Sequence, residues 1–235
     1  IISIDQGTTS SRAILFDLKG QPVYSSQKEF TQYFPKSGWV EHDPEEIWST
    51  TKKTLSNVIK KSKKIKGTIL TIGITNQRET TVLWDKKTGK AVYNAIVWQD
   101  RRQEEFCKKL RKQNKETLIF NRTGLLIDSY FSGTKIKWIL DNVPLAKKLM
   151  KKKQLLFGTI DSFLIWRLTK GKVHATDATN ASRTMIYNIT SNMWDETILK
   201  ILKIDKNILP IVKDCADDYG STHPSITGKS ISISG

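Results

Sequence analysis

The chain has 235 residues and a mass of 26.9 kDa, and its 38% hydrophobic content suffices for one large domain or two small ones. No apolar run approaches the roughly 18 residues that cross a bilayer, and the N-terminus lacks the layout of a signal peptide, so we expect no membrane insertion. The two cysteines, Cys107 and Cys215, exclude a disulfide framework and favour the reducing cytoplasm.

The charge balance is strongly basic, with a net charge of +16 and a pI of about 9.7, which raises the question of nucleic-acid binding. Lysine dominates over arginine, and the lysines gather in runs such as 60–64 and 147–153, without interleaved aromatic residues on which bases could stack. Solvated helix faces explain this pattern better. We therefore expect no nucleic-acid partner.

The first predicted element is a β-hairpin over residues 1–17. A β-branched run leads into a small hydroxylated turn around Gly7, and a second apolar run leaves it. Gly7 lets the backbone approach a ligand closely, and residues 8–11 (Thr8, Thr9, Ser10 and Ser11) supply hydroxyl and amide donors. The pattern therefore predicts a phosphate-binding turn.

Two charged residues flank this turn. Arg12 adds a positive planar group, and Asp5 is placed to hold a hydrated Mg²⁺ beside the phosphates. An ordinary polar β-turn is the alternative, but four consecutive hydroxyl residues between Asp5 and Arg12 favour the phosphate interpretation. The turn is neither a Walker loop nor a dinucleotide fingerprint, because the required glycine spacings are absent.

A third strand begins at Pro22, so the chain opens with an antiparallel meander. Asp43, Pro44 and Glu46 then form a helix start, with an aspartate cap, a proline at the first position and a glutamate three residues after the cap. In the preceding loop, Trp39 and His42 could line a site. We interpret them instead as a packed aromatic residue and a surface histidine.

Residues 69–75 form a nearly continuous apolar run that predicts a buried parallel strand. Ligands gather at the carboxyl ends of such strands, which makes Gln77, Arg78 and Glu79 candidates for substrate contacts. An adjacent Arg and Glu suit the hydroxyl groups of a polyol. A surface ion pair is the alternative.

A second hairpin is predicted over residues 81–85 and 91–98, followed by a helix from Gln99 through Leu110. Trp98 ends the hairpin, where it could cover the carbon side of a small polyol or serve only in packing. Further elements are predicted as a helix over 130–142, a strand leading into a helix cap at 155–161, a helix over 162–169, a polar loop over 176–184, a strand at 185–189, a helix from 194 through 202 and a strand at 228–235.

Several segments together resemble the sugar and polyol kinases of the FGGY family, and most closely its glycerol-phosphorylating members. The similar segments, in chain order, are Asp5–Arg12, Gly38–Pro44, Gly73–Thr81, Tyr93–Gln99, Tyr130–Asn142 and Thr179–Thr184. The resemblance covers essentially all of residues 1–235. It implies an α/β fold of the actin-like ATPase (RNase H-like) type, with a mixed sheet, an antiparallel meander and flanking helices.

The resemblance also implies MgATP-dependent phosphorylation of glycerol to sn-glycerol 3-phosphate. The nucleotide phosphates would be contacted by Thr8, Thr9, Ser10 and Arg12, with Asp5 supporting Mg²⁺ through water. Glycerol would be held by Arg78, Glu79 and Tyr130, with Trp98 packed on its carbons. Members of the family often form homo-oligomers.

The chain departs from the family at its end. The family places its catalytic base in a Gly-Asp-Gln motif shortly after a Ser-Gly pair, and this chain ends at Ser234-Gly235. We expect the base beyond Gly235, the C-terminal domain to be absent, and the isolated chain to be weak or inactive. The Gly-rich segment that binds fructose 1,6-bisphosphate in regulated members is replaced by residues 225–230, so that regulation is not expected.

Three alternatives stay open at this stage. The substrate could be another small polyol or sugar, or the chain could be a non-catalytic binding module left by truncation. Nuclease-like activity is disfavoured, because two-metal chemistry needs several converging carboxylates and only Asp5 and Asp161 qualify.

Overall fold

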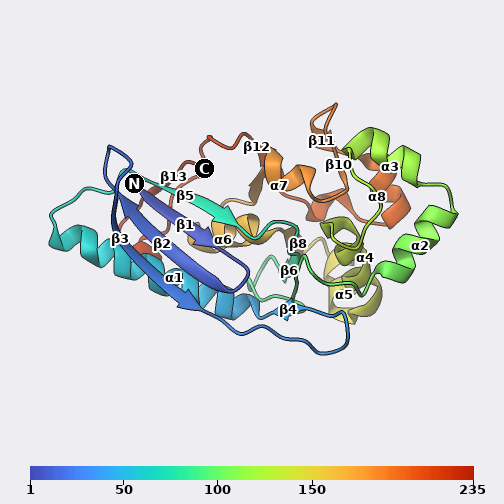
Figure 1. Ribbon diagram of the computed structural model, residues 1–235, viewed down its shortest axis with the longest axis horizontal. Helices are drawn as coiled ribbons and strands as arrows, with labels where there is room; N and C mark the ends of the chain where they lie inside the picture. The colour runs from blue at the N-terminus through green and yellow to red at the C-terminus, as the bar shows by residue number, and fades with distance from the viewer.

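The computed structural model describes residues 1–235, and one end of the molecule is built on a five-stranded mixed sheet (Figure 1). The strand order is β13-β5-β1-β2-β3, with β1 Ile2–Gln6, β2 Ser10–Phe16, β3 Pro22–Glu29, β5 Thr71–Asn76 and β13 Ser232–Ile233. The pairs β1–β2 and β2–β3 are antiparallel, whereas β5 runs parallel to both β1 and β13. The predicted meander and the parallel strand are confirmed.

One face of this sheet is covered by helices α1 (Pro44–Lys64) and α6 (Ile160–Leu168). Burial alternates along β1, where Ile2 and Ile4 are fully buried and Ser3 and Asp5 are not, as the period of a strand requires. The same alternation leaves one side of β5 open, so the prediction of burial on both faces is only partly correct. Asp5 thus lies on the open face, beside its cross-strand partner Arg12.

Helix α1 begins as predicted, because the Asp43 carboxylate accepts a hydrogen bond from Glu45 N at 2.8 Å and Pro44 occupies the first turn. Glu46 does not return to the cap. Its carboxylate instead accepts hydrogen bonds from Thr31 N (2.8 Å) and Tyr33 Oη (2.9 Å). The first turn of α1 is therefore fastened to the chain that enters it.

The second predicted hairpin forms, because Val92 N donates to Leu83 O at 2.9 Å and the backbones of Thr81 and Ile96 exchange bonds of 2.9 and 3.1 Å. Strand β6 (Val82–Asp85) pairs along its length with β8 (Leu155–Gly158), and β7 (Ala95–Ile96) pairs with β4 (Glu41–His42). Strand β6 and its flank thus pair with residues 90–96 in the hairpin and, for β6, with the distant β8 as well. Strand β8 is apolar throughout and buried on both faces, so it takes the interior position beside β6.

The β6–β8 ladder separates two hydrophobic cores. Trp84 and Leu156 point into the core between the sheet and helices α1 and α6, whereas Leu83 and Phe157 point into a second core. Helices α2 (Glu104–Lys112), α3 (Glu116–Thr123), α4 (Ser132–Asn142), α5 (Pro144–Lys151) and α8 (Glu196–Leu202) surround this second core at the other end of the molecule (Figure 1).

The remaining elements are β9 Ala175–Asp177, α7 Ala178–Ser182, β10 Tyr187–Asn188, β11 Met193–Trp194, η1 Lys206–Ile208, β12 Ile211–Lys213 and α9 Pro224–Thr227. The polar loop predicted at 176–184 is wrong, because the Asp177 carboxylate accepts from Asn180 N at 2.8 Å and caps the short helix α7. Helix α2 begins at Glu104 and not at Gln99, since Asp100 and Arg102 are drawn into a buried ion pair. None of the helices is both long and apolar enough for a membrane span.

Candidate functional site

The first part of the candidate site is the turn between β1 and β2. Gly7 N donates to Ser10 O at 2.9 Å, which closes the turn and leaves Thr9 exposed at its tip. Gln32 Nε2 donates to Thr8 O at 2.7 Å and ties the turn to the segment after β3. The hydroxyl residues of the predicted phosphate turn are thus presented at the end of the sheet by a fixed backbone.

Asp5 and Arg12 face each other across β1 and β2. Arg12 donates from Nη2 and Nε to Asp5 Oδ2, at 2.5 and 3.2 Å. Both side chains remain partly exposed. Because both bonds go to Oδ2, the other carboxylate oxygen of Asp5 is left for water.

The second part is an aromatic wall formed by Trp98 and Tyr130, whose ring centroids lie 5.7 Å apart. Trp98 stands directly against the turn, since its indole Nε1 donates to Thr8 Oγ1 at 3.0 Å. The guanidinium of Arg183 lies 5.6 Å from the centroid of the Tyr130 ring. Two of the residues predicted for the polyol site thus contact each other and one residue of the phosphate turn.

Glu79 lies beside this wall. Its side chain is almost buried and its Oε1 accepts from Arg183 Nε at 2.7 Å. The backbone of Glu79 has a positive φ of 62°, and its carbonyl oxygen accepts from Ser132 Oγ at 3.0 Å, at the start of α4. The alternative of a surface ion pair with Arg78 is wrong, because Glu79 pairs with Arg183.

Arg78 is exposed, and Gln77 is used elsewhere. The Gln77 amide donates to Gln6 Oε1 (3.1 Å) and to Gly7 O (3.2 Å), beneath the phosphate turn. Gln77 therefore supports the turn, and only Arg78 and Glu79 of this trio are left for ligand contacts.

His42 is fully buried, so its interpretation as a surface histidine is wrong. Its Nε2 is 2.9 Å from Gln32 Oε1 and its Nδ1 is 3.3 Å from Gln77 Nε2, a pattern that matches a neutral ring with its proton on Nε2. Burial lowers the pKa of His42 to about 4. The ring thus joins the two amides that hold the turn in place.

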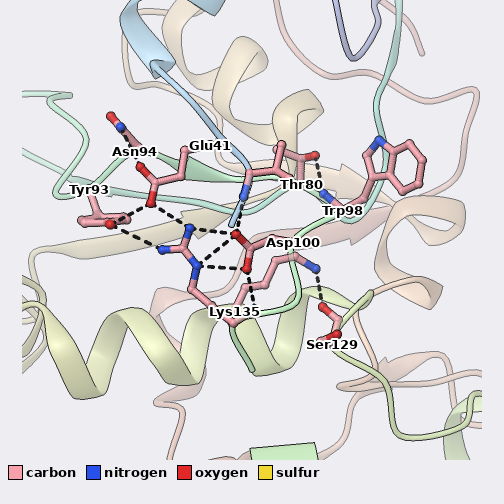
Figure 2. A network of polar contacts seen from close by, with 10 residues as sticks. Glu41, Thr80, Tyr93, Asn94, Trp98, Asp100, Ser129 and Lys135 are labelled. Atoms are coloured by element: carbon pink, nitrogen blue, oxygen red, sulfur yellow. Dashed lines mark hydrogen bonds and ion pairs between the residues drawn. The ribbon is translucent and has the colours of Figure 1, made fainter. Parts of the chain in front are cut away.

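A buried ionic network lies next to the aromatic wall. Figure 2 shows Glu41, Asp100 and Tyr93 directed toward one guanidinium group, which belongs to Arg102. The Arg102 side chain has no exposed surface, and its guanidinium carbon lies 3.8 Å from the centroid of the Trp39 ring. Trp39 is thus a packed aromatic residue, as predicted.

The site carries donors, acceptors and an apolar wall, but no preformed metal cage. No group of three or more His, Cys, Asp or Glu side chains is placed to hold a metal ion. Asp5 lies beside the turn and its second carboxylate oxygen accepts no hydrogen bond from the protein, so it fits the outer-sphere contact of a hydrated Mg²⁺. The site is suited to bringing a phosphate chain next to a small hydroxylated molecule.

Sequence reasoning did not single out Arg183, which contacts Glu79 and Tyr130, or Lys135, which donates to the Tyr130 carbonyl. Arg183 lies in a segment that resembles the family, yet it is 104 residues from Glu79 in sequence. Lys135 resembled one more lysine in a basic chain, although it is completely buried. Two signals marked it: its place in the segment Tyr130–Asn142 that resembles the family, and its position on the apolar face of the predicted helix.

The sequence and the fold were compared with those of known proteins. Residues 1–233 match the N-terminal domain of the FGGY family of carbohydrate kinases. The chain is 57% identical over 235 residues to the glycerol kinase of Rhizobium meliloti (strain 1021), covering 100% of this chain and 47% of that protein. It is 58% identical over 224 residues to the glycerol kinase of Malacoplasma penetrans (strain HF-2), covering 95% and 44%.

Solved structures give the same relationship. The crystal structure of Plasmodium falciparum glycerol kinase with ADP superposes with a TM-score of 0.95 at 38% identity, covering 100% of this chain and 47% of that one. A xylulose kinase from Lactobacillus acidophilus gives a TM-score of 0.83 at 26% identity, covering 99% and 46%. The fold is thus the actin-like ATPase fold of these kinases, and the chain spans about half the length of the relatives it matches. The chain belongs to the FGGY family of carbohydrate kinases, and it corresponds to their N-terminal domain.

Proposed function

We propose that this chain is the N-terminal domain of a glycerol kinase, which transfers the terminal phosphoryl group of MgATP to glycerol and forms sn-glycerol 3-phosphate. The observation that carries the proposal is the 3.0 Å contact between Trp98 Nε1 and Thr8 Oγ1, which joins the phosphate turn to the aromatic wall. Phosphoryl transfer depends chiefly on holding donor and acceptor side by side. The relatives of 57–58% identity, all glycerol kinases, support glycerol as the acceptor.

In this proposal the nucleotide phosphates are held by the turn. Thr8, Thr9 and Ser10 donate hydroxyl and amide hydrogens, and Arg12 supplies positive charge from the neighbouring strand. Mg²⁺, when bound, neutralises the charge that develops on the phosphates. Asp5 would hold the hydrated ion through water, with the carboxylate oxygen that Arg12 leaves free.

The acceptor is held beside Trp98. Glu79 accepts a hydrogen bond from a glycerol hydroxyl, and Arg78 and Tyr130 complete the polar contacts, while the indole covers the carbon atoms. Arg183 fixes the Glu79 carboxylate through its 2.7 Å bond. The wall thus orients a terminal hydroxyl toward the turn.

No carboxylate of residues 1–235 is assigned as the proton acceptor, which the family resemblance places after Gly235. We propose residues 1–235 as a single domain with little turnover of its own. The whole protein would act in the cytoplasm as a homo-oligomer, and both unpaired cysteines fit a reducing compartment.

Calorimetric titration of the purified chain with glycerol, paired with a coupled assay for ADP release, tests the proposal. We expect binding that is lost in Arg78→Ala and Glu79→Gln and kept in the remote control Asp17→Asn, with little or no ADP release. Arg78 is an informative variant because it is exposed, so its loss should not disturb folding.

The same titration with ribitol, xylulose and gluconate separates the alternatives. Preference for one of these ligands over glycerol would reassign the substrate within the family. Binding of none of them, by a chain that is folded by circular dichroism, would contradict an acceptor site in this domain.

A further inference from the structure

One lysine is buried completely next to the proposed acceptor site. Lys135 lies in the first turns of α4, and its Nζ donates to Ser129 O at 2.8 Å, to Tyr130 O, and to Phe131 O at 3.4 Å. Figure 2 shows its side chain reaching back toward Ser129. All three ammonium hydrogens therefore go to consecutive carbonyl groups of one loop.

The carbonyl groups of Ser129 and Tyr130 precede α4, whereas that of the N-cap Phe131 also accepts from Thr134 Oγ1 at 3.2 Å. The ammonium therefore supplies the partner that the first two carbonyl groups need. Burying a charge without a partner is costly, and a lysine is almost never fully buried unless its ammonium is paired. The nearby Asp100 carboxylate, part of the network around Arg102, offsets part of the cost.

The loop held by Lys135 carries the residues that shape the acceptor site. The Tyr130 ring packs on Trp98 and lies near the guanidinium of Arg183. One residue further along, Ser132 Oγ donates to the carbonyl oxygen of Glu79. A change in the path of residues 129–131 would thus displace both the aromatic wall and its neighbouring carboxylate.

We propose that Lys135 is a positioning residue of the acceptor site, whose ammonium fixes residues 129–131 and thereby places the Tyr130 ring against Trp98. This inference rests on the proposed function for its ligand, glycerol. It assigns a role that acts through the loop, because Lys135 itself has no surface from which it could reach a ligand.

Protonation offers a way to test this role without a mutation. Burial lowers the pKa of Lys135 to about 7, and the facing groups Asp100, Glu79, Asp128 and Cys107 act against that shift. A neutral amine has only two hydrogens for the three carbonyls. The grip on the loop therefore weakens as the pH rises through the pKa of Lys135.

The experiment is an NMR titration of the full chain labelled with ¹³C at lysine Cε and ¹⁵N at tryptophan, with and without glycerol. We expect one lysine to titrate near neutral pH and the Trp98 indole N–H signal to move with the same midpoint. Glycerol should raise that midpoint by about one pH unit, which by linkage means about tenfold weaker glycerol binding at pH values above both midpoints.

A Trp98 signal that stays fixed while Lys135 titrates would overturn the inference, whether or not glycerol binds. A midpoint that glycerol leaves unchanged, in a chain that binds glycerol, would also overturn it and leave the proposed function intact. Failure of glycerol to bind at any pH would count against the proposed function alone, because the Trp98 signal still reports on the loop.

Two variants complete the test. Lys135→Met should move the Trp98 signal and weaken glycerol binding about tenfold, whereas Lys137→Met, two residues along α4 and paired with Asp141, should do neither. Urea unfolding of both variants separates loss of the fold from loss of positioning. The inference would be contradicted by a folded Lys135→Met chain that keeps both the Trp98 signal and the glycerol affinity of the unmodified protein. This criterion also applies if no lysine titrates near neutral pH.

Discussion

The indole of Trp98 donates a hydrogen bond to the hydroxyl of Thr8, 90 residues earlier in the chain, at 3.0 Å. In donating to Thr8, Trp98 leaves the hydroxyl hydrogen free to bond a phosphate oxygen. The backbone N–H of Trp98 is held in turn by Thr80 Oγ1 at 3.3 Å (Figure 2). The contact thus connects the phosphate turn with the acceptor wall.

The first prediction concerns the energetic coupling of these two residues. Thr8→Val and Trp98→Phe should each weaken glycerol binding, and the double variant should lose less than the sum, with a coupling of about 0.5–1.5 kcal/mol for one hydrogen bond. Calorimetric titration of the unmodified chain, the two single variants and the double variant with glycerol gives this coupling energy. Thr9→Val is the matched control, since the exposed Thr9 lies next to Thr8; strict additivity would show that the contact does not link the two parts.

The second prediction concerns Arg183. Arg183→Met removes the partner of the nearly buried Glu79 carboxylate and should lower the free energy of unfolding by about 1–3 kcal/mol, less than for a fully buried pair because Arg183 is about one-third exposed. Glycerol binding should fall as well. Urea denaturation measures the first effect and calorimetry the second.

Arg101→Met provides the comparison for Arg183. The Arg101–Asp128 pair has a similar length of 2.7 Å, but both side chains are about half exposed. Its loss should change the free energy of unfolding by less than about 1 kcal/mol. If both variants lost the same free energy of unfolding, the burial of Glu79 would not strengthen its ion pair with Arg183.

The third prediction is a pH dependence of stability that comes from His42. Its pKa in the folded chain is about 4, below the ordinary value of 6.5, because burial disfavours the charged ring. Between these two values the unfolded chain binds more protons, so the free energy of unfolding falls as the pH is lowered from about 6.5 toward 4. One such group contributes at most about 1.4 kcal/mol per pH unit.

Urea unfolding at several pH values from about 7 to 4.5 measures this slope. His42→Gln keeps a hydrogen-bonding side chain between Gln32 and Gln77, and we expect it to flatten the slope partially. The remaining slope has a second source in His174, whose pKa burial also lowers to about 4. An unchanged slope in His42→Gln would assign the acid sensitivity to other groups.

The fourth prediction separates stability from ligand binding at Gly7. A Cβ added at Gly7 would meet only Ser10 O at 3.5 Å, an ordinary contact, so Gly7→Ala should unfold within about 0.5 kcal/mol of the unmodified chain. The added methyl would nevertheless stand where a phosphate approaches the backbone. Binding of Mg²⁺-tripolyphosphate, followed by calorimetry, should weaken about tenfold.

Gly133→Ala should behave in the opposite way. Its Cβ would come within 2.9 Å of Ile186 Cγ2 and Thr184 O, so we expect a loss of about 1–3 kcal/mol in the free energy of unfolding. If Gly7→Ala binds tripolyphosphate normally, the turn is an ordinary β-turn and not a phosphate site.

The sequence by itself determined the elements whose signals are local. Strand alternation indicated the meander of β1, β2 and β3, the capping residue Asp43 indicated the start of α1, and helical periodicity indicated α4. Each of these signals lies within a few neighbouring residues of the chain. The segments that resemble the FGGY family likewise indicated the fold, because each is a short motif that is complete in sequence. Most of the candidate site residues were likewise identified from these short family-like segments.

The tertiary structure alone decided which residues meet. Glu79 pairs with Arg183 across 104 residues and not with its neighbour Arg78, and β6 pairs with the distant β8 in addition to its local hairpin. His42 and Lys135 became buried because distant polar groups satisfy them, which no local pattern encodes. Long-range partners are set by packing of the whole chain, and the charge state of His42 and Lys135 follows from that packing.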